Sequence, residues 1–185
     1  GVDVSFHNLD ETTEPVDIRF ENCRMENNHH SSVVIARNKF NGAPKGKVLF
    51  NDCTMIGGKV RGVELLRKVG DGFRVEFNRC RIENACPDGA ADVTFVSRDW
   101  SDNPPDNIAF NDLVIVQPKA RPWFQNVAPG VGPAAVTNLT GAVTVKSPKG
   151  EEKIVLDAAW MKANFRDPPS QPPVRWEMDA EPSVR

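Results

Sequence analysis

One pattern of apolar and polar positions recurs four times in the first two thirds of the chain. Each copy reads aliphatic, variable, Phe, two polar residues, Cys or Leu, variable, and Met or Ile. The copies lie at residues 18–25, 48–55, 75–82 and 108–115, so successive copies begin 30, 27 and 33 residues apart. A period of this length predicts a solenoid, in which each repeat buries its apolar side against its neighbours.

Each copy predicts two short strands that meet at a corner. In the first copy Ile18 and Phe20 share one face of a strand, because side chains alternate between the two faces. Cys23 and Met25 are out of step with that alternation, so a two-residue bend separates the strands. Asn and Asp are common in these bends, as expected where the backbone visits left-handed angles.

A third strand follows each corner, at residues 33–35, 63–65 and 93–95, with its outer residues inward and its middle residue outward. Stacking such units predicts three parallel sheets around a narrow core. Over residues 2–116 the chain resembles the pectate-lyase-like superfamily of right-handed parallel β-helices, whose coils carry such corners, often with an Asn ladder. That fold hosts lyases, hydrolases, esterases, tailspikes and adhesins, so the resemblance implies no single activity.

The expected fold is therefore all-β, with about four coils over residues 1–127. A cap at residues 128–166 is predicted to hold a β-hairpin and a short helix that Asp157 caps, and residues 167–185 form a Pro-rich tail. Phe6 precedes Phe20 by 14 residues, and Ile35 precedes Phe50 by 15. This similar spacing places Phe6 level with Ile35. Residues 2–6 then become the third strand of a preceding coil, and we expect N-terminal coils of the same protein, or another chain, to cover Val2–Phe6.

Composition narrows the classes of partner. The 185 residues include 23 basic and 25 acidic side chains, which give a formal charge of −2. This charge does not indicate the strongly basic surface that nucleic-acid-binding proteins carry. No apolar run approaches the ~18 residues of a membrane span. The four cysteines form no Cys-x-x-Cys pair and no His stands at zinc-finger spacing, so no metal site and no cofactor are expected.

Three of the cysteines share an inward position in successive coils. Cys23, Cys53 and Cys80 are expected to be buried free thiols, although stacked thiols about 4.8 Å apart could oxidise in principle. Cys86 lies in a turn beside Pro87 and is the candidate for an exposed thiol.

Two carboxylates on the third-strand side are the candidate catalytic pair. Glu64 and Asp92 lie one coil and two residues apart, about 8 Å, which suits an inverting acid and base. The alternative is two solvated acids on an exposed face, since surface carboxylates are common. The adjacent residues His29 and His30 follow the first corner and are expected to lie in a solvated turn.

Basic residues follow the third strands in two columns, Arg37 with Arg67 and Lys68 with Arg98. Such a strip suits uronic-acid or sulfated substrates, where Arg neutralises a carboxylate beside the proton to be removed, and it also suits edge protection against strand pairing. The paired Asp ligands of calcium-dependent pectate lyases are not evident. We assign Arg67 and Arg98 to catalysis with Glu64 and Asp92, and list as substrate-binding residues Arg37, Lys68, Asp99 and the sugar-stacking candidate Trp100.

The resemblance implies the C-terminal part of a secreted carbohydrate-processing protein of the polysaccharide lyase or glycoside hydrolase type, located outside the cell, at its surface or in the periplasm. Its ligand would be a polysaccharide, with anionic polymers included. The alternative is a non-catalytic structural or adhesive β-helix that serves as a spacer or binding surface. An enzyme should show a cleft over the third-strand sheet, whereas a spacer should show that face flat, open or covered.

Overall fold

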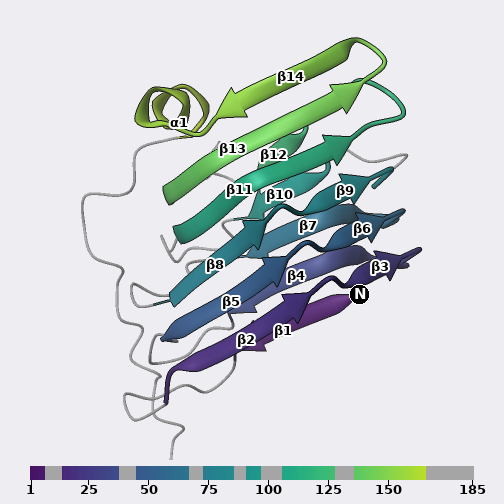
Figure 1. Ribbon diagram of the computed structural model, residues 1–185. Coiled ribbons are helices and arrows are strands. Elements are labelled where there is room, and N and C mark those ends of the chain that lie inside the picture. Colours follow the sequence, from purple (N-terminus) through teal and green to yellow (C-terminus); the bar gives the residue numbers. More distant parts are fainter. Residues whose placement is uncertain are drawn as a thin grey trace, which may run out of the picture.

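The computed structural model describes residues 1–6, 14–37, 45–66, 73–85, 91–96, 106–127 and 136–165. In this part the chain is a parallel β-solenoid of about three turns, closed at one end by a hairpin and a short helix (Figure 1). The predicted all-β class and the solenoid are therefore confirmed. No helix of the described residues has the length and apolar character needed to cross a membrane.

Three turns repeat the predicted order of three strands. The first turn contains β2 (Val16–Glu21), β3 (Arg24–Glu26) and β4 (Ser31–Arg37). The second contains β5 (Gly46–Asn51), β6 (Thr54–Ile56) and β7 (Arg61–Leu66), and the third contains β8 (Phe73–Asn78), β9 (Arg81–Glu83) and β10 (Val93–Val96). One strand, β1 (Val2–Phe6), precedes these turns, and β11 (Asp106–Val116) and β12 (Phe124–Val127) continue the stack beyond them.

The hydrogen-bonded sheets differ from the expectation of three. β1, β4, β7, β10 and β12 form one parallel sheet, whereas the first and second strands of the turns belong to a single nine-stranded sheet. The two are joined because β11 runs unbroken past the corner, with a register shift between Phe110 and Leu113. The solenoid therefore keeps three faces but has two sheets.

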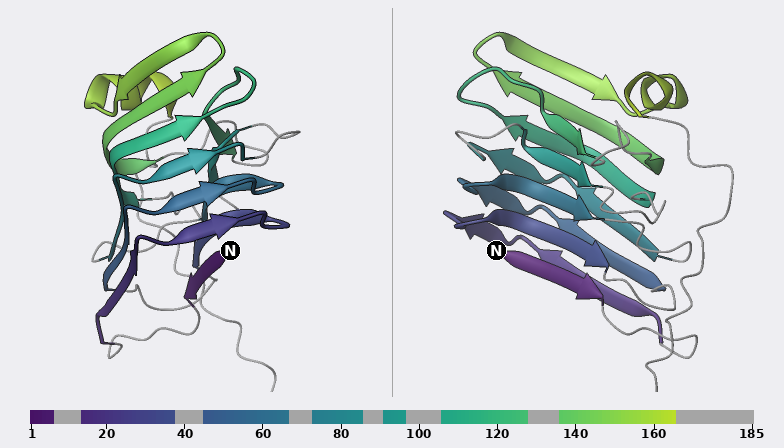
Figure 2. Two further views of the ribbon diagram at one scale, coloured as in Figure 1. Left: turned by 45° about the vertical axis from the view of Figure 1, so that its right-hand side comes forward. Right: turned by 180° about the vertical axis from the view of Figure 1, so that it is seen from behind.

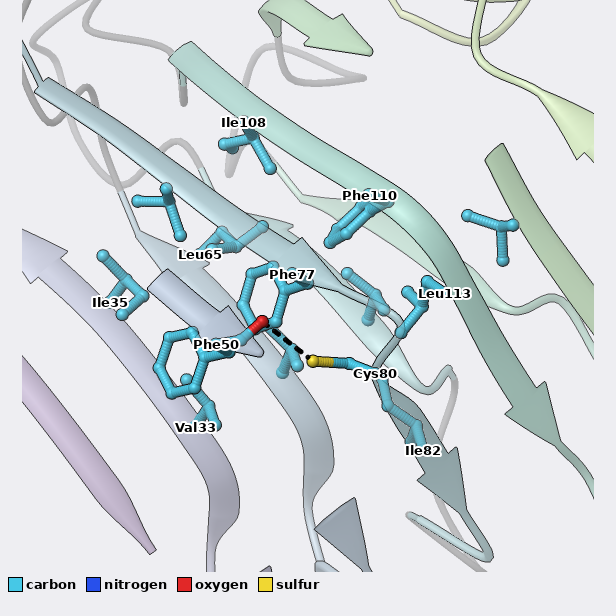
Figure 3. Close-up of a cluster of buried hydrophobic side chains, with 14 of the residues drawn as sticks. Val33, Ile35, Phe50, Leu65, Phe77, Cys80, Ile82, Ile108, Phe110 and Leu113 are labelled. Carbon is cyan, nitrogen blue, oxygen red and sulfur yellow. Dashed lines mark hydrogen bonds between the residues drawn. The ribbon is translucent and has the colours of Figure 1, made fainter. Parts of the chain in front are cut away.

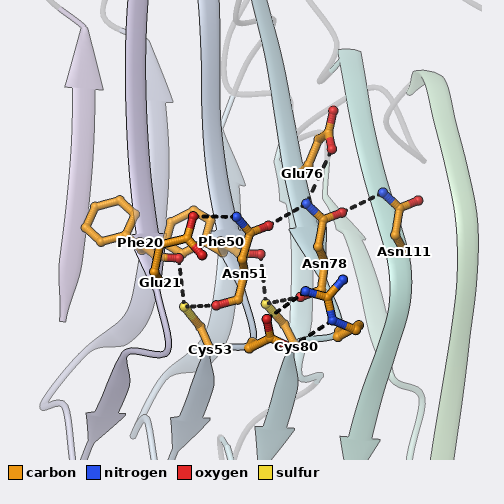
Figure 4. Close-up of polar contacts among 11 residues, drawn as sticks. Phe20, Glu21, Phe50, Asn51, Cys53, Glu76, Asn78, Cys80 and Asn111 are labelled. Atoms are coloured by element: carbon orange, nitrogen blue, oxygen red, sulfur yellow. Dashed lines mark hydrogen bonds and ion pairs between the residues drawn. The ribbon is translucent and has the colours of Figure 1, made fainter.

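The predicted corners are confirmed by left-handed backbone angles. The corner residues Asn22, Asp52, Arg79 and Asp112 have φ of 51°, 53°, 51° and 60°. Just before each corner, the side chains form a ladder in which Asn51 donates to Glu21, Asn78 to Asn51, and Asn111 to Asn78 over 2.6–2.7 Å (Figure 4). Each Asn amide in the ladder therefore donates to the side-chain oxygen of the residue one turn before it.

The core follows the recurring Phe and Cys positions (Figure 3). The rings of Phe20 and Phe50 stack at 4.7 Å, and those of Phe50 and Phe77 at 4.8 Å, which is the spacing of stacked strands. The Cys53 thiol donates to the carbonyl of Phe20 and the Cys80 thiol to that of Phe50, over 3.3 and 3.2 Å. Each thiol thus ties one turn to the turn before it.

The register of β1 corrects one prediction. β1 pairs with β4 in parallel, as expected for a third strand, but Val4 lies level with Ile35 and Phe6 with Arg37. The expected register is therefore wrong by two residues. A shift of two keeps the same side chains on the inner face, so the alternation of apolar residues could not distinguish the two registers.

The predicted hairpin and helix close the other end of the stack (Figure 2). β13 (Thr137–Ser147) lies parallel to β11, and β14 (Gly150–Val155) turns back antiparallel to β13. The helix α1 (Ala158–Asn164) begins at Asp157, whose carboxylate accepts from the Trp160 amide at 2.8 Å. Trp160 and the C-cap residue Phe165 pack against Trp123 and Phe124, with ring centroids 5.3–5.9 Å apart. The Pro-rich tail lies outside the described residues.

Candidate functional site

The two candidate carboxylates are both buried. Glu64 lies on β7, level with Val34 and Thr94 in a column that alternates with the core residues, as predicted. Its exposed fraction is nevertheless 4%, and that of Asp92 is 0%. The expectation of two solvated acids on an open face is therefore wrong. Because a buried carboxylate is costly unless it is paired, the partners of each define what the site does.

The Glu64 carboxylate receives its partners from two turns. The Ser31 hydroxyl, 6% exposed, donates to Glu64 Oε2 at 2.9 Å, and Ser31 Oγ also lies 3.2 Å from His30 Nδ1. His30 Nδ1 and Arg61 Nη1 each lie 3.9 Å from the same carboxylate oxygen. Arg61 is held in place because its Nε donates to Thr94 Oγ1 at 2.6 Å.

His30 is the accessible member of this group. Its side chain is 66% exposed, in agreement with the predicted solvated turn, while the carboxylate behind it is 6% exposed. The Ser31 hydroxyl lies between the imidazole and the carboxylate. This order differs from a catalytic triad, in which the imidazole stands between acid and hydroxyl. The arrangement places an exposed imidazole next to a buried carboxyl group.

Asp92 stands where the chain bends into the third strand. Its carbonyl accepts from the amides of both Gly62 and Val63, so the backbone turns at this residue. Its carboxylate accepts from Gln117 Nε2 at 2.7 Å and from Arg121 Nη2 at 2.7 Å. Burial raises the pKa of Asp92, while the hydrogen bonds from Arg121 and Gln117 act in the opposite direction. This cluster fastens the third turn to the segment that follows β11.

The partners of the two carboxylates come from opposite directions along the stack. Those of Glu64 lie in the first and second turns, whereas those of Asp92 follow β11. The other candidate site residues are not placed: Arg67, Lys68, Arg98, Asp99 and Trp100 lie outside the described residues, and of Arg37 only the backbone, in β4, is described.

No protein-family model matches this chain, and no match was found among curated proteins or among solved structures. The site therefore has to be interpreted from its own geometry. Among the described residues, no group of three or more His, Cys, Asp or Glu side chains is arranged to hold a metal ion.

An open depression of about 440 Å³ lies beside the Asp92 cluster, because Gln117 and Arg121, the partners of the Asp92 carboxylate, are part of its lining. It is formed by the segment that follows β11 and by the β13–β14 hairpin, and its lining includes Arg121, Pro122, Ser147 and Lys149. Neither Glu64 nor Asp92 contributes to its lining. Its position differs from the cleft over the third-strand sheet that an enzyme of this fold is expected to show.

The predicted thiols are confirmed as free and, in two of three cases, as fully buried. Cys53 and Cys80 are each 1% exposed and Cys23 is partly buried. Burial raises the pKa of Cys53, and raises that of the Cys80 thiol to about 12. Such thiols stay protonated at neutral pH and are not nucleophiles. Cys86 lies outside the described residues.

Sequence reasoning missed four residues that complete the two clusters, namely Ser31, Arg61, Gln117 and Arg121. In the structure, the backbone amide of Gln117 donates along the stack as those of Asn27, Gly57 and Asn84 do. Gln117 therefore follows β11 at the position that Asn27, Gly57 and Asn84 take after β3, β6 and β9. Its side chain points to Asp92, which that position alone does not predict.

Proposed function

We propose that this chain is a non-catalytic structural or adhesive β-helix, in which the stacked turns form a rigid spacer or binding surface. The observation that carries this proposal is the state of Asp92, which has no exposed surface and is neutralised by Arg121. A carboxylate in that position cannot reach a substrate unless the chain rearranges. Its hydrogen bonds to Gln117 and Arg121 support a role in joining successive turns.

A second candidate function is carbohydrate processing of the lyase or hydrolase type, at the group formed by His30, Ser31 and Glu64. The exposed imidazole beside a buried carboxylate favours it, because an imidazole can act as a general acid or base. The likeness to pectate-lyase-like β-helices, which bind polysaccharide along the third-strand sheet, supports a uronic-acid polymer as the substrate class. A secreted, cell-surface or periplasmic location belongs to both proposals.

The two candidates are separated by a screen of the full chain against uronic-acid polysaccharides. Lyase activity is followed by the absorbance of unsaturated products and hydrolase activity by reducing ends. His30→Ala is the informative variant because His30 is exposed, and His29→Ala, also exposed, is its matched control. We expect no turnover by the wild type, and we expect Glu64→Gln and Asp92→Asn to lower the midpoint of thermal unfolding while leaving any polysaccharide binding unchanged. Turnover that is lost in His30→Ala and kept in His29→Ala would establish the second candidate instead.

A further inference from the structure

The strand β14 is the last strand of the stack at the closed end. Among the described residues it pairs with β13 alone, so its second edge has no neighbouring strand (Figure 1). The Leu156 amide donates to Gly141 of β13 at 3.0 Å, and successive residues of a strand turn their backbone groups to opposite edges. The amides of Glu151, Lys153 and Val155 therefore face the free edge. A row of unpaired backbone groups is a template for a further strand.

A column of inward side chains runs through successive turns and ends on this strand. The strand registers place five apolar residues level with one another, each at most 9% exposed, namely Met25, Met55, Ile82, Ile115 and Val145. The residue opposite Val145 on β14 is Glu152. Opposite residues of an antiparallel pair point to the same face. The Glu152 side chain therefore stands at the position that would continue the apolar column.

Solvent takes the place of the core at Glu152. This residue is exposed, and together with Val145 it lines the open depression at the hairpin. Ile154, two residues further along, is partly buried against the core, because it lies level with Val143 in the neighbouring column. The strand β14 thus continues one apolar column and ends the other with a charge.

The position of Glu152 makes the free edge of β14 a poor acceptor for another strand. A strand added there would place an inward side chain beside Glu152 and cover its carboxylate, and burial of an unpaired carboxylate is costly. A second copy of β14, paired antiparallel about this residue, would also bring its own Glu152 directly opposite, where like charges destabilise the pair. Inward-pointing charges are one means by which β-sheet proteins protect an exposed edge.

We propose that Glu152 prevents the free edge of β14 from pairing with another strand, including β14 of a second copy of this chain. The hairpin reverses the direction of the strands, and Glu152 removes the apolar surface on which a further strand would pack. The proposal does not depend on whether the β-helix is a spacer or an enzyme, because it concerns the closed end and not the third-strand sheet.

The test is Glu152→Val in the full chain, because valine would continue the apolar column onto β14. Sedimentation equilibrium over a hundredfold range of concentration compares its self-association with that of the wild type. We expect an association constant at least about tenfold above that of the wild type, since no carboxylate has to be buried. Glu152→Lys keeps a charge at the inward position and should associate no more than the wild type.

The matched control is Glu151→Val, the same change one residue earlier and on the other face, where Glu151 binds Lys146 at 3.0 Å. It should leave association as in the wild type. A second variant adds Lys153→Pro to Glu152→Val. Proline removes an N–H group from the free edge and none from the bonds to β13, so this double variant should return to the association of the wild type.

Circular dichroism and thermal unfolding establish that each variant keeps the fold. The proposal would be overturned by a folded Glu152→Val that associates no more than the wild type. An equal gain in Glu151→Val or Glu152→Lys would also overturn it, because the inward charge would then not be the cause. Association of Glu152→Val that survives Lys153→Pro would show that the contact does not use the free edge of β14, which contradicts the proposal as well.

Discussion

The core is covered to different extents at the two ends of the solenoid. At the β2 end, Phe20 stacks on Phe50 on one side and remains partly exposed. At the far end the stack stops because β14 reverses direction and α1 brings Trp160 and Phe165 over the last aromatic residues. Stacking alone therefore extends a parallel solenoid, and ending it takes a change of strand direction or a helix.

The largest effect is expected from removing a ring inside the stack. Phe50→Ala should lower the free energy of unfolding by about 3–5 kcal/mol, because the ring is fully buried between Phe20 and Phe77. Phe20→Ala, the matched change at the open end, should cost clearly less. Equilibrium denaturation with urea measures both values. Equal losses at the two positions would show that the β2 end is as well covered as the interior.

A smaller loss is expected at the closed end. Trp160→Ala removes a partly buried ring that contacts Trp123, Phe124 and Phe165, and should cost about 2 kcal/mol. Lys162→Ala, exposed on the same helix, is the control and should change stability by less than about 0.5 kcal/mol. If Trp160→Ala behaves like the control in denaturation experiments, the helix does not stabilise the end of the stack.

The fold was predictable because its signal is a repeated set of apolar positions. The columns that contain Phe50 and Cys53 needed only the period and the alternation of side chains to place them in the core. The site was less predictable, because alternation gives the face on which Glu64 lies and not whether that face is covered. Asp92 illustrates a second difficulty, since its partner Arg121 comes from a segment outside the repeat, and the direction of the Gln117 side chain does not follow from its place in the stack.

The smallest predicted effect on stability concerns Asp92 and depends on pH. Asp92→Asn should cost about 1 kcal/mol at pH 7, because one of the two carboxylate oxygens that accept from Gln117 and Arg121 becomes an NH2 group that cannot accept. The folded-state pKa of Asp92 is raised above 3.8, so the folded protein takes up this proton at a higher pH than the unfolded chain. The stability of the wild type relative to the variant should therefore increase as the pH falls from neutrality through that raised pKa, and level off below the unfolded-state pKa.

Thermal unfolding of both proteins between pH 7 and pH 3 measures this difference. Glu152→Gln, which changes an exposed carboxylate on β14, is the control for the loss of one negative charge. A constant gap between the wild type and Asp92→Asn would mean that Asp92 titrates alike in the folded and unfolded chains.

The cysteines of successive turns allow local opening of the solenoid to be followed by chemical labelling. Cys23, Cys53 and Cys80 stand in three successive turns, and the thiols of Cys53 and Cys80 are hydrogen bonded to the turn before. A thiol reagent modifies a buried cysteine only after its turn has opened, since the reactive thiolate does not form inside. The order in which the buried Cys53 and Cys80 become labelled therefore reports which of these two neighbouring turns opens first.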